Sequence, residues 1–360
     1  MPDIIIAPWL LQLSLLVIGI SCVVLIAVIA SARAIRRRRD RTLARELEPL
    51  RRDVLEVASG EDEGGSHERL AGLPPRLFRL VAPVLIGMLS KVRGAPSVAI
   101  VAVLAAHGAV RLAHTGLGSR SRFRRARSAW TLGLMRDESS VDELIPLLQD
   151  RDRSVAITAA RALGMLGDPS AATPLLDSLE PGRRGHGGVP VWIVVDALAE
   201  IGPGVSSAVG TALRSPSPTV RAAAAQTAAR AQLISLGPQI RTLLADEDDV
   251  AVLAAAATAL GGHGGPADIP ALNRLATADR PRSVRLAAVE ALGEIGGPDS
   301  VGALLPLLTD DDAPVAEHAG QWLTRLGPQA RAEVEAVASR EGGTAARYAL
   351  VTSALGRGAP

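Results

Sequence analysis

The sequence predicts an all-α solenoid that is preceded by one transmembrane helix. A short phrase with a central leucine, usually Ala-Leu-Gly, recurs to the end of the chain at steps of 31, 35, 30, 32, 32, 31 and 32 residues. A fixed period in this range is typical of stacked helical repeats, because each short unit buries its apolar face only against its neighbours. The central residues of the phrases are Leu132, Leu163, Leu198, Ala228, Leu260, Leu292, Leu323 and Leu355. We therefore expect a scaffold.

The composition agrees with closely packed helices. Aromatic residues make up 2% of the 360 residues, and alanine is abundant. The formal net charge is +2, so the overall charge gives no argument for a nucleic-acid partner, and none is expected. The single cysteine, Cys22, lies in an apolar run, which excludes an intramolecular disulfide framework and a cysteine-based metal cluster.

The predicted transmembrane helix covers residues 10–30, a stretch of 21 residues without charge. As a helix it is about 31 Å long, which is enough to cross a hydrocarbon core. Trp9 precedes the span and a run of arginines follows it, so residues 1–32 are predicted to be an anchor with its N-terminus outside the cell. The predicted location is the cell (cytoplasmic) membrane, single-pass, with the solenoid facing the cytoplasm. A cleaved signal peptide is the alternative, since an Ala-Ser-Ala sequence ends the span, but no basic region precedes it.

Two segments of different composition follow the anchor. Residues 33–58 are predicted to form a basic juxtamembrane amphipathic helix. Its apolar stripe within residues 43–57 has heptad-like spacing, so a weak homodimer contact is the alternative to an isolated helix. Residues 59–75 have the acidic and glycine-rich composition of a flexible linker.

Apolar helices are predicted in residues 76–118, where they would cap the solenoid, and the repeat domain is predicted to cover residues 119–360. Membrane insertion of residues 77–113 is the alternative. Arg79 and Pro83 in the first part of this segment, and Arg111 in the second, argue against it, because charge is costly inside a bilayer.

Two groups of arginines are candidates for contact with anionic lipid. One follows the anchor and the other lies in the first helix of the repeat domain. The alternatives are that the first group sets the membrane topology and that the second group is a solvated cap. The candidates are Arg36, Arg37, Arg38, Arg39, Arg120, Arg122, Arg124 and Arg125.

The best repeat unit predicts a helical hairpin. Val284, Ala288, Ala291 and Leu292 share one helical face, and a Gly-Pro pair at residues 297–298 ends that helix and lets a second one begin. The pattern resembles the HEAT-repeat family, in particular the short bacterial subtype first noted in bilin-lyase-related proteins. The closest match lies at residues 154–169, and the resemblance covers about residues 95–357. It implies a right-handed α-solenoid of about eight HEAT-like hairpins.

The resemblance also implies charged ties between neighbouring repeats, from an arginine early in one helix to an acid in a turn. Arg221 and Arg285 keep the arginine, whereas Ala156, Leu253 and Ala316 replace it. Acidic turn residues stand at Asp150, Asp152, Asp248, Asp310 and Asp312. Because this ladder is partial, apolar stacking must supply most of the cohesion.

By the same resemblance, the Ala-Leu-Gly helices line the concave surface, with residues two before or two after the central leucine facing solvent. Such a face would match charges on an extended peptide or a helix, with two tryptophans as anchors. A solvated face without a ligand is the alternative. The candidate partner-binding residues are Trp130, Arg161, Trp192, Asp196, Glu200, Gln226, Arg230, Glu290, Glu294, Gln321 and Arg325.

Signs of catalytic chemistry are missing from the sequence. The six histidines have no metal-ligand spacing, and there is no Walker loop, nucleophile elbow or dinucleotide fingerprint. No catalytic residue, metal or cofactor is therefore predicted. Residues 261–265, four glycines around His263, are interpreted as a helix end, and acidic clusters at residues 246–249 and 310–312 as helix caps rather than cation sites. Residues 181–188 are interpreted as a surface loop, with phosphate binding as the alternative.

Taken together, these features predict a membrane-anchored, non-catalytic scaffold or adaptor. Its cytoplasmic solenoid would bind a protein partner, whose identity the sequence does not reveal, in an envelope-associated complex. The alternatives are an accessory or lyase-like subunit of an enzyme, or a binder of lipid or nucleic acid through its basic surface.

Overall fold

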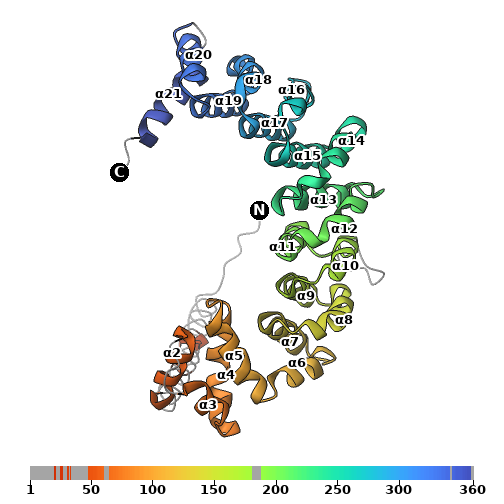
Figure 1. The fold of residues 1–360 in the computed structure, drawn as a ribbon, viewed down its shortest axis with the longest axis vertical. Helices are drawn as coiled ribbons and strands as arrows, with labels where there is room; N and C mark the ends of the chain where they lie inside the picture. The colour runs from red at the N-terminus through yellow and green to blue at the C-terminus, as the bar shows by residue number, and fades with distance from the viewer. Residues whose placement is uncertain are drawn as a thin grey trace, which may run out of the picture. The chain divides into compact units, whose positions relative to one another are not determined.

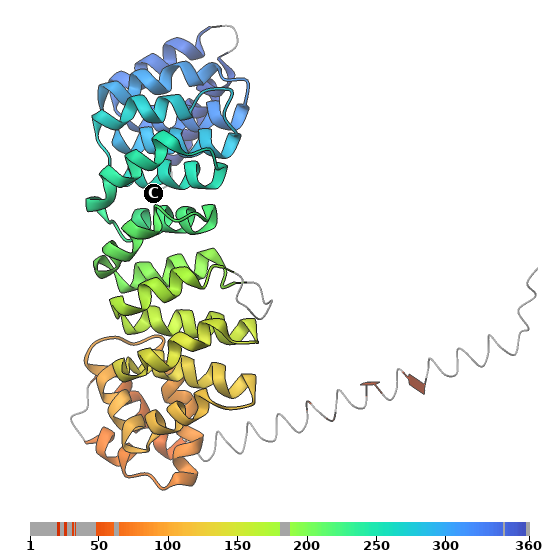
Figure 2. The ribbon, with the colours of Figure 1, turned by 90° about the vertical axis from the view of Figure 1, so that its right-hand side faces the viewer.

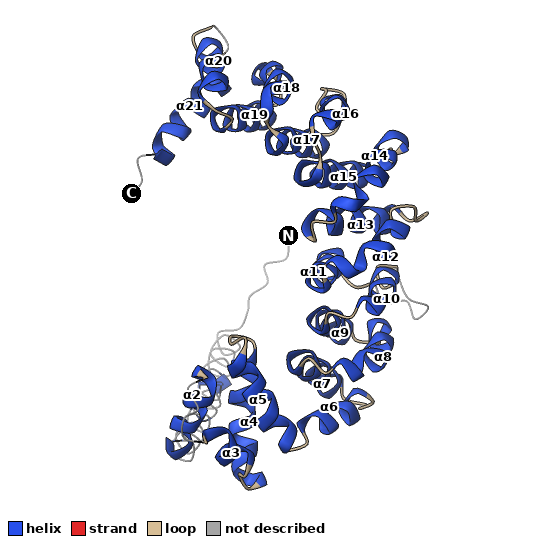
Figure 3. Ribbon diagram, viewed as in Figure 1, coloured by secondary structure: helices blue, strands red, loops and turns tan. Residues whose placement is uncertain are grey.

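The computed structural model describes residues 48–60, 65–180, 188–340 and 343–357, together with Ile20, Ser21, Leu25, Ile26, Ser31 and Arg33. These residues contain helices and turns but no strand, which confirms the all-α prediction (Figure 3). The helices belong to two compact units, Met1–Ala109 and Val110–Pro360. Most of the predicted anchor, Arg36 to Arg39 and the loop at residues 181–187 lie outside the described residues.

The predicted transmembrane helix at residues 10–30 lies mostly outside the described residues, so only the described helices can be compared with the length of a membrane span. None of them alone is both long and apolar enough to cross a membrane. Two bent pairs pass by length and composition only: Ala95–Ala106 with Ala109–Leu117, at 74°, and Val191–Ile201 with Pro203–Ala212, at 112°.

The first unit is a small helical cluster. It contains the 3-10 helix η1 (Glu48–Leu50) and the helices α2 (Arg51–Ser59), α3 (Ser66–Ala71), α4 (Pro75–Leu89) and α5 (Ala95–Ala106). Helix α5 packs on α2, α3 and α4, and its side chains Ile100 and Leu104 are fully buried. The ring of Phe78 stacks on His107, with ring centroids 3.6 Å apart, and His107 Nε2 lies 2.9 Å from the carbonyl oxygen of Leu70.

The prediction of a flexible linker over residues 59–75 is wrong for α3. Ser66 and Leu70 of this helix are fully buried. The Ser66 hydroxyl donates to Asp53 and Glu56 of α2, at 3.0 and 2.6 Å. Burial of one leucine and two hydrogen bonds therefore hold a segment whose composition alone indicated a linker.

The apolar stripe within residues 43–57 is also used inside this unit. Val54 and Val57 are 6% and 0% exposed, and their helix α2 packs on α3 and α5. Their own chain covers these two valines, so this part of the stripe is not exposed for the homodimer contact that was the alternative to an isolated helix. The earlier part of the stripe, before residue 48, lies outside the described residues.

The second unit begins with α6 (Ala109–Leu117) and continues as two layers of helices (Figures 1 and 2). The inner layer, on the concave side of the stack in Figure 1, holds the Ala-Leu-Gly helices α7 (Arg122–Met135), α9 (Arg153–Leu166), α11 (Val191–Ile201), α13 (Pro218–Arg230), α15 (Val250–His263), α17 (Arg282–Ile295), α19 (Ala313–Arg325) and α21 (Thr344–Arg357). The outer layer holds α8 (Val141–Leu144) with η3 (Ile145–Gln149), α10 (Ala172–Asp177), α12 (Ser206–Ala212), α14 (Gly237–Asp246), α16 (Ile269–Leu275), α18 (Gly297–Leu304) with η8 (Leu305–Thr309), and α20 (Pro328–Ala338). The predicted solenoid of helical hairpins is confirmed.

The predicted boundary between cap and repeats moves from residue 118 to residue 109. Helix α6 belongs to the second unit, because Ala113 and Leu117 are buried in the same core as Leu132. Helices α4 and α5, which were predicted to cap the solenoid, belong to the first unit with α2 and α3.

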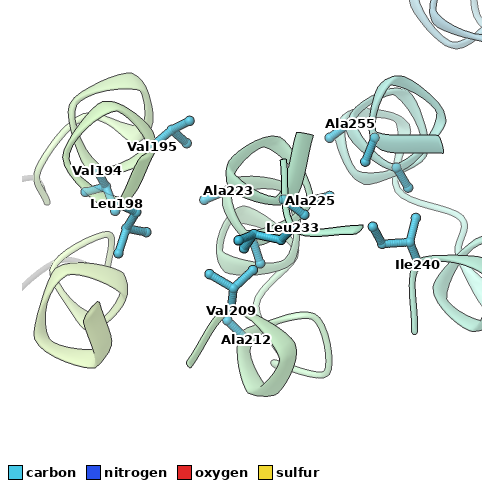
Figure 4. Close-up of a cluster of buried hydrophobic side chains, with 14 of the residues drawn as sticks. Val194, Val195, Leu198, Val209, Ala212, Ala223, Ala225, Leu233, Ile240 and Ala255 are labelled. Atoms are coloured by element: carbon cyan, nitrogen blue, oxygen red, sulfur yellow. The ribbon is translucent and has the colours of Figure 1, made fainter. Parts of the chain in front are cut away.

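One continuous core fills the space between the two layers. Seven of the eight central residues of the repeated phrase are 0% exposed. Figure 4 shows the middle of this core, where Leu198 of α11, Val209 of α12 and Ile240 of α14 are buried. The exception is Leu355 of α21, which is 72% exposed because no described outer helix follows it. The described repeats are therefore seven hairpins and a final single helix.

Neighbouring inner helices approach closely at the glycine of the repeated phrase. A Cβ atom on Gly164 would lie 2.8 Å from the Cα atom of Ala197, and one on Gly133 would lie 2.7 Å from the Cα atom of Ala162. Gly261 likewise meets the backbone of α17, and it lies inside α15. The interpretation of residues 261–265 as a helix end is confirmed, since α15 ends at His263 with Gly264 as its cap, and close helix packing is a further reason for glycine at position 261. Absence of a side chain lets the inner layer pack backbone to backbone.

Three of the ion pairs between repeats of the second unit form the partial ladder that the resemblance implied. They are Arg125 with Asp150, Arg221 with Glu247, and Arg285 with Asp310. Arg221 donates to both carboxylate oxygens of Glu247, at 2.8 and 3.0 Å, and to the carbonyl oxygens of Ser215 and Pro216. Such a two-pronged pair is shorter and more directional than a single hydrogen bond.

The paired residues keep one register. Each arginine stands seven residues before a central residue, and each acid stands thirteen before the next one. Three other junctions lack both partners, with Ala156, Val191 and Ala316 in the arginine position and no acid opposite. Because loss of one partner would leave a partly buried charge unpaired, the two are present together or absent together at these six junctions. The remaining junction has Leu253 and Asp279.

The sequence prediction of this ladder needs two corrections. Arg125 was assigned to lipid contact, but its side chain is 15% exposed and it binds Asp150. The partner of Arg221 is Glu247 and not the adjacent Asp248. Both could have been found by counting from the central residues of the phrase.

Candidate functional site

A groove of about 910 Å³ crosses the inner layer from α11 to α17. Small side chains of α13 and α15 form much of its lining, because these two helices are rich in alanine. Polar and charged side chains stand among them. Those used below are Gln226 and Arg230 of α13, Ala254 and Thr258 of α15, and Ser283 and Glu294 of α17.

The width of the groove follows from the residues of its helices. Ala254 and Ala255 of α15 line it, where longer side chains would fill the space. On the opposite face of the same helix, Ala256 and Leu260 are fully buried in the core. Alanine therefore occupies both the buried face and the groove face of α15. Its small side chain leaves a groove with an apolar surface, and Gln226 and Thr258 supply hydrogen-bonding groups there.

The charges of the groove are of both signs. Arg230 is ion-paired with Asp196 of α11, with nitrogen and oxygen 3.0 Å apart, and both side chains remain partly exposed. Partial burial raises the pKa of the Glu294 carboxyl, and the nearby Glu290 adds to this effect. Within the described residues Glu294 forms no ion pair. A cationic group in the groove would therefore be favoured beside Glu294.

Two tryptophans of the inner layer interact with arginines. The guanidinium of Arg161 on α9 lies 5.6 Å from the ring centroid of Trp192 on α11, and Trp192 is 57% exposed. On α19, Arg325 lies 5.4 Å from the ring of Trp322. A cation held over an aromatic ring stabilises that arrangement by roughly 0.5–1 kcal/mol at an exposed site. Arg161 and Trp192 thus form a preassembled aromatic and cationic surface.

Glu290 has a structural contact that the sequence did not indicate. Trp322 donates its indole N–H to Glu290 Oε2, at 3.2 Å, and His318 pairs with the same carboxylate. Glu290 therefore joins α17 to α19. The interpretation of Glu290 as a free recognition residue needs this correction.

The predicted partner-binding residues all lie on inner-layer helices, and each is exposed or half-buried. Gln226, Arg230 and Glu294 line the groove. The others lie beside it along the layer, on α7, α9, α11, α17 and α19: Trp130, Arg161, Trp192, Asp196, Glu200, Glu290, Gln321 and Arg325.

The groove also contains residues that sequence reasoning missed. Ala251 and Ser283 line it, and both stand nine residues before a central leucine. Gln232, beyond the end of α13, lines it as well. The sequence contained a signal for Ala251 and Ser283, because the position nine residues before the central leucine lies two helical turns from the position two residues before it, which was predicted to face solvent.

Of the arginines predicted to contact lipid, Arg122 and Arg125 are engaged elsewhere. Arg122 donates to Asp152 at 2.9 Å, and Arg125 holds Asp150. These contacts reduce the positive charge that the first inner helix presents. Arg120 and Arg124 are exposed.

The described residues hold no group of three or more His, Cys, Asp or Glu side chains placed to bind a metal. Of the two acidic clusters interpreted as caps, residues 246–249 contain one in Asp249, whereas the side chain of Asp312, at the start of α19, makes no capping hydrogen bond. Asp249 accepts from the amides of Ala251 and Val252, at 2.9 and 3.1 Å, and Asp152 accepts from Ser154 at 2.9 Å. These hydrogen bonds satisfy amides that the first turn of a helix leaves unpaired.

Comparisons with known proteins agree with this architecture. A family model described as HEAT repeats matches residues 116–184, 206–292, 237–324 and 275–350. No curated protein sequence matches the chain.

Several solved structures are similar in fold. The CpcE and CpcF complex of phycocyanin lyase from Nostoc sp. PCC7120 is 24% identical over 68% of this chain and 87% of that chain, with a TM-score of 0.31. Human deoxyhypusine hydroxylase is 18% identical over 78% of this chain and 98% of that chain, with a TM-score of 0.29. Kap95p, in a complex with RanGDP, is 14% identical over 84% of this chain and 49% of that chain, with a TM-score of 0.46.

Proposed function

Because this chain belongs to the HEAT-repeat family, we propose that it is a non-catalytic scaffold or adaptor whose inner layer binds a protein partner. The observation that carries this proposal is the groove from α11 to α17, which combines an apolar surface with polar and charged edges. Its volume of about 910 Å³ holds several side chains of a polypeptide.

The chemistry of the groove suits a helix or an extended segment with charges of both signs. A basic side chain of the partner would pair with Glu294, and an acidic one would compete with Asp196 for Arg230. An aromatic or aliphatic side chain would pack on the exposed ring of Trp192. The alanine surface between them allows close approach of a backbone.

Site-specific photo-crosslinking tests this proposal. A photoreactive residue replaces Thr258 in the groove of the full chain, and a second protein carries the same residue at Thr211, which is exposed on α12 of the outer layer. We expect one partner to be crosslinked from Thr258 and not from Thr211. The added change Arg230→Glu should reduce that crosslink. The proposal fails when both positions capture the same proteins or when Arg230→Glu has no effect.

We also propose that residues 1–32 anchor the protein in the cell (cytoplasmic) membrane by a single pass, with the second unit in the cytoplasm. The uncharged run at residues 10–30 and the arginines that follow it support this proposal. Deletion of residues 1–32 should release the protein from alkali-washed membranes. Retention of the shortened protein in the washed membranes would contradict an anchor at this place.

A further inference from the structure

Helix α5 of the first unit is apolar on all sides, yet the described residues of the chain cover only one of them. Its 12 residues include no charged side chain. Ile100 and Leu104 are fully buried, whereas Val98 is 69% exposed and Ala102 and Ala105 are exposed on the same side of the helix. A helix that is apolar all round is normally buried all round. Among the described residues, none covers the exposed face of α5, although its composition favours burial.

The charges next to this face are positive. From residue 69 to residue 109, the end of the first unit, the sequence contains four arginines and one lysine but no Asp or Glu. Lys91 and Arg93 are exposed in the connection that leads directly into α5. The first turns of α4 expose Arg76 and Arg79. A surface that attracts anions thus adjoins the apolar face.

Two acidic side chains on a helix that contacts α5 are engaged with partners other than these cations. Helix α2 packs on α5 and carries Asp53 and Glu56. Asp53 pairs with Arg69, and Glu56 pairs with Arg52 and accepts a hydrogen bond from Ser66. These carboxylates are engaged within α2 and α3.

We propose that the exposed face of α5, together with Lys91 and Arg93, docks on the surface of an anionic lipid bilayer. Val98 and its neighbours would enter the boundary between head groups and acyl chains, and the two cations would contact lipid phosphates. As a helix of about 18 Å, α5 is too short to span a bilayer but long enough to lie in its interface. This contact is separate from the groove of the second unit, and it does not depend on the proposed protein partner.

Fluorescence at Val98 tests the proposal in the full chain. Cys22→Ser removes the single cysteine, Val98→Cys introduces a new one, and a polarity-sensitive dye is attached there. The protein is reconstituted with vesicles of phosphatidylcholine alone or of phosphatidylcholine mixed with phosphatidylglycerol. We expect a blue shift of the dye, and its quenching by spin-labelled lipid, only with the anionic vesicles. The same dye at Val250, which is exposed in the second unit, should not respond.

Charge variants test the role of the cations. Neutralising Lys91→Gln and Arg93→Gln together should lower the ratio of docked to undocked protein about 30-fold, because each cation near an anionic surface contributes about 1 kcal/mol. The matched control is Arg151→Gln with Arg153→Gln, two exposed arginines with the same spacing at the start of α9. The control should dock like the parent protein.

A measurement without a dye guards against effects of labelling. Anionic vesicles should protect the bonds after Lys91 and Arg93 from trypsin in the parent protein, and Val98→Asp, a change at an exposed position, should abolish that protection. Absence of both the shift and the protection overturns the proposal. A dye shift that depends on protein concentration rather than on lipid would indicate self-association and would also overturn it. The same holds if the variant with Lys91 and Arg93 neutralised docks as well as the parent protein.

Discussion

The substitution Gly164→Ala tests whether backbone contact holds the inner layer together. The new Cβ atom would lie 2.8 Å from the Cα atom, 3.1 Å from the Cβ atom and 3.2 Å from the carbonyl oxygen of Ala197. Carbon atoms in contact prefer about 3.5–4.0 Å, so α9 and α11 would have to separate by roughly 1 Å. Such overpacking costs about 1–3 kcal/mol, and the better helix propensity of alanine returns about 0.5–1 kcal/mol. The net expectation is a loss of about 1–2 kcal/mol.

Urea unfolding followed by circular dichroism measures this loss in the full chain. The matched control is Gly302→Ala in α18, where a new Cβ atom would meet nothing within 4 Å. That change should raise stability by about 0.5–1 kcal/mol, because it only restricts the unfolded chain and favours the helix. The same substitution is thus expected to have opposite signs at the two positions. Equal effects, or a Gly164→Ala protein as stable as the parent, would refute the role of backbone contact.

Two further predictions concern charged side chains of the second unit. Arg221→Ala should lower the free energy of unfolding by about 3 kcal/mol, because it leaves Glu247 unpaired at 6% exposure, and the double change with Glu247→Ala should recover part of this loss in urea unfolding. His114 lies 2.7 Å from an oxygen of Asp137 and 2.9 Å from one of Glu143. Although burial alone lowers the pKa of His114, these hydrogen bonds raise it above its ordinary value of 6.5. The stabilisation is therefore complete below about pH 6.5 and is lost as the pH rises through the folded pKa. His114→Gln should flatten this part of the dependence of stability on pH, and an unchanged slope would contradict the argument.

The periodicity of the chain predicts which side chains of each repeat are buried. Val284, Ala288 and Leu292 were assigned to one face of a helix, and all three are 0% exposed. This works because burial within a hairpin depends on helical geometry and on the apolar pattern, both of which are local. Composition was a poorer guide over residues 66–71, where a single buried leucine and a serine hydroxyl outweigh an acidic and glycine-rich background.

The candidate site was predictable only in part. Helical spacing placed Gln226, Arg230 and Glu294 on the solvent side of the inner helices, and all three line the groove. The pairing of Arg161 with Trp192 was not predictable, because it depends on how far one helix is shifted along the next. Nor was the depth of the groove, which depends on alanine in two adjacent helices at once.

The sequence by itself determined the repeat, the two helices of each hairpin and the register of the charged ladder. These properties recur at a fixed spacing, so the assignment of one repeat can be transferred to the others. Only the tertiary structure decided that α6 belongs with the repeats, that Arg161 lies over the ring of Trp192, and that Gly261 meets the backbone of the next inner helix. The physical reason is that contacts between repeats depend on how far apart two helices lie and how far one is shifted along the other. Both quantities depend on side chains that are far apart in the chain.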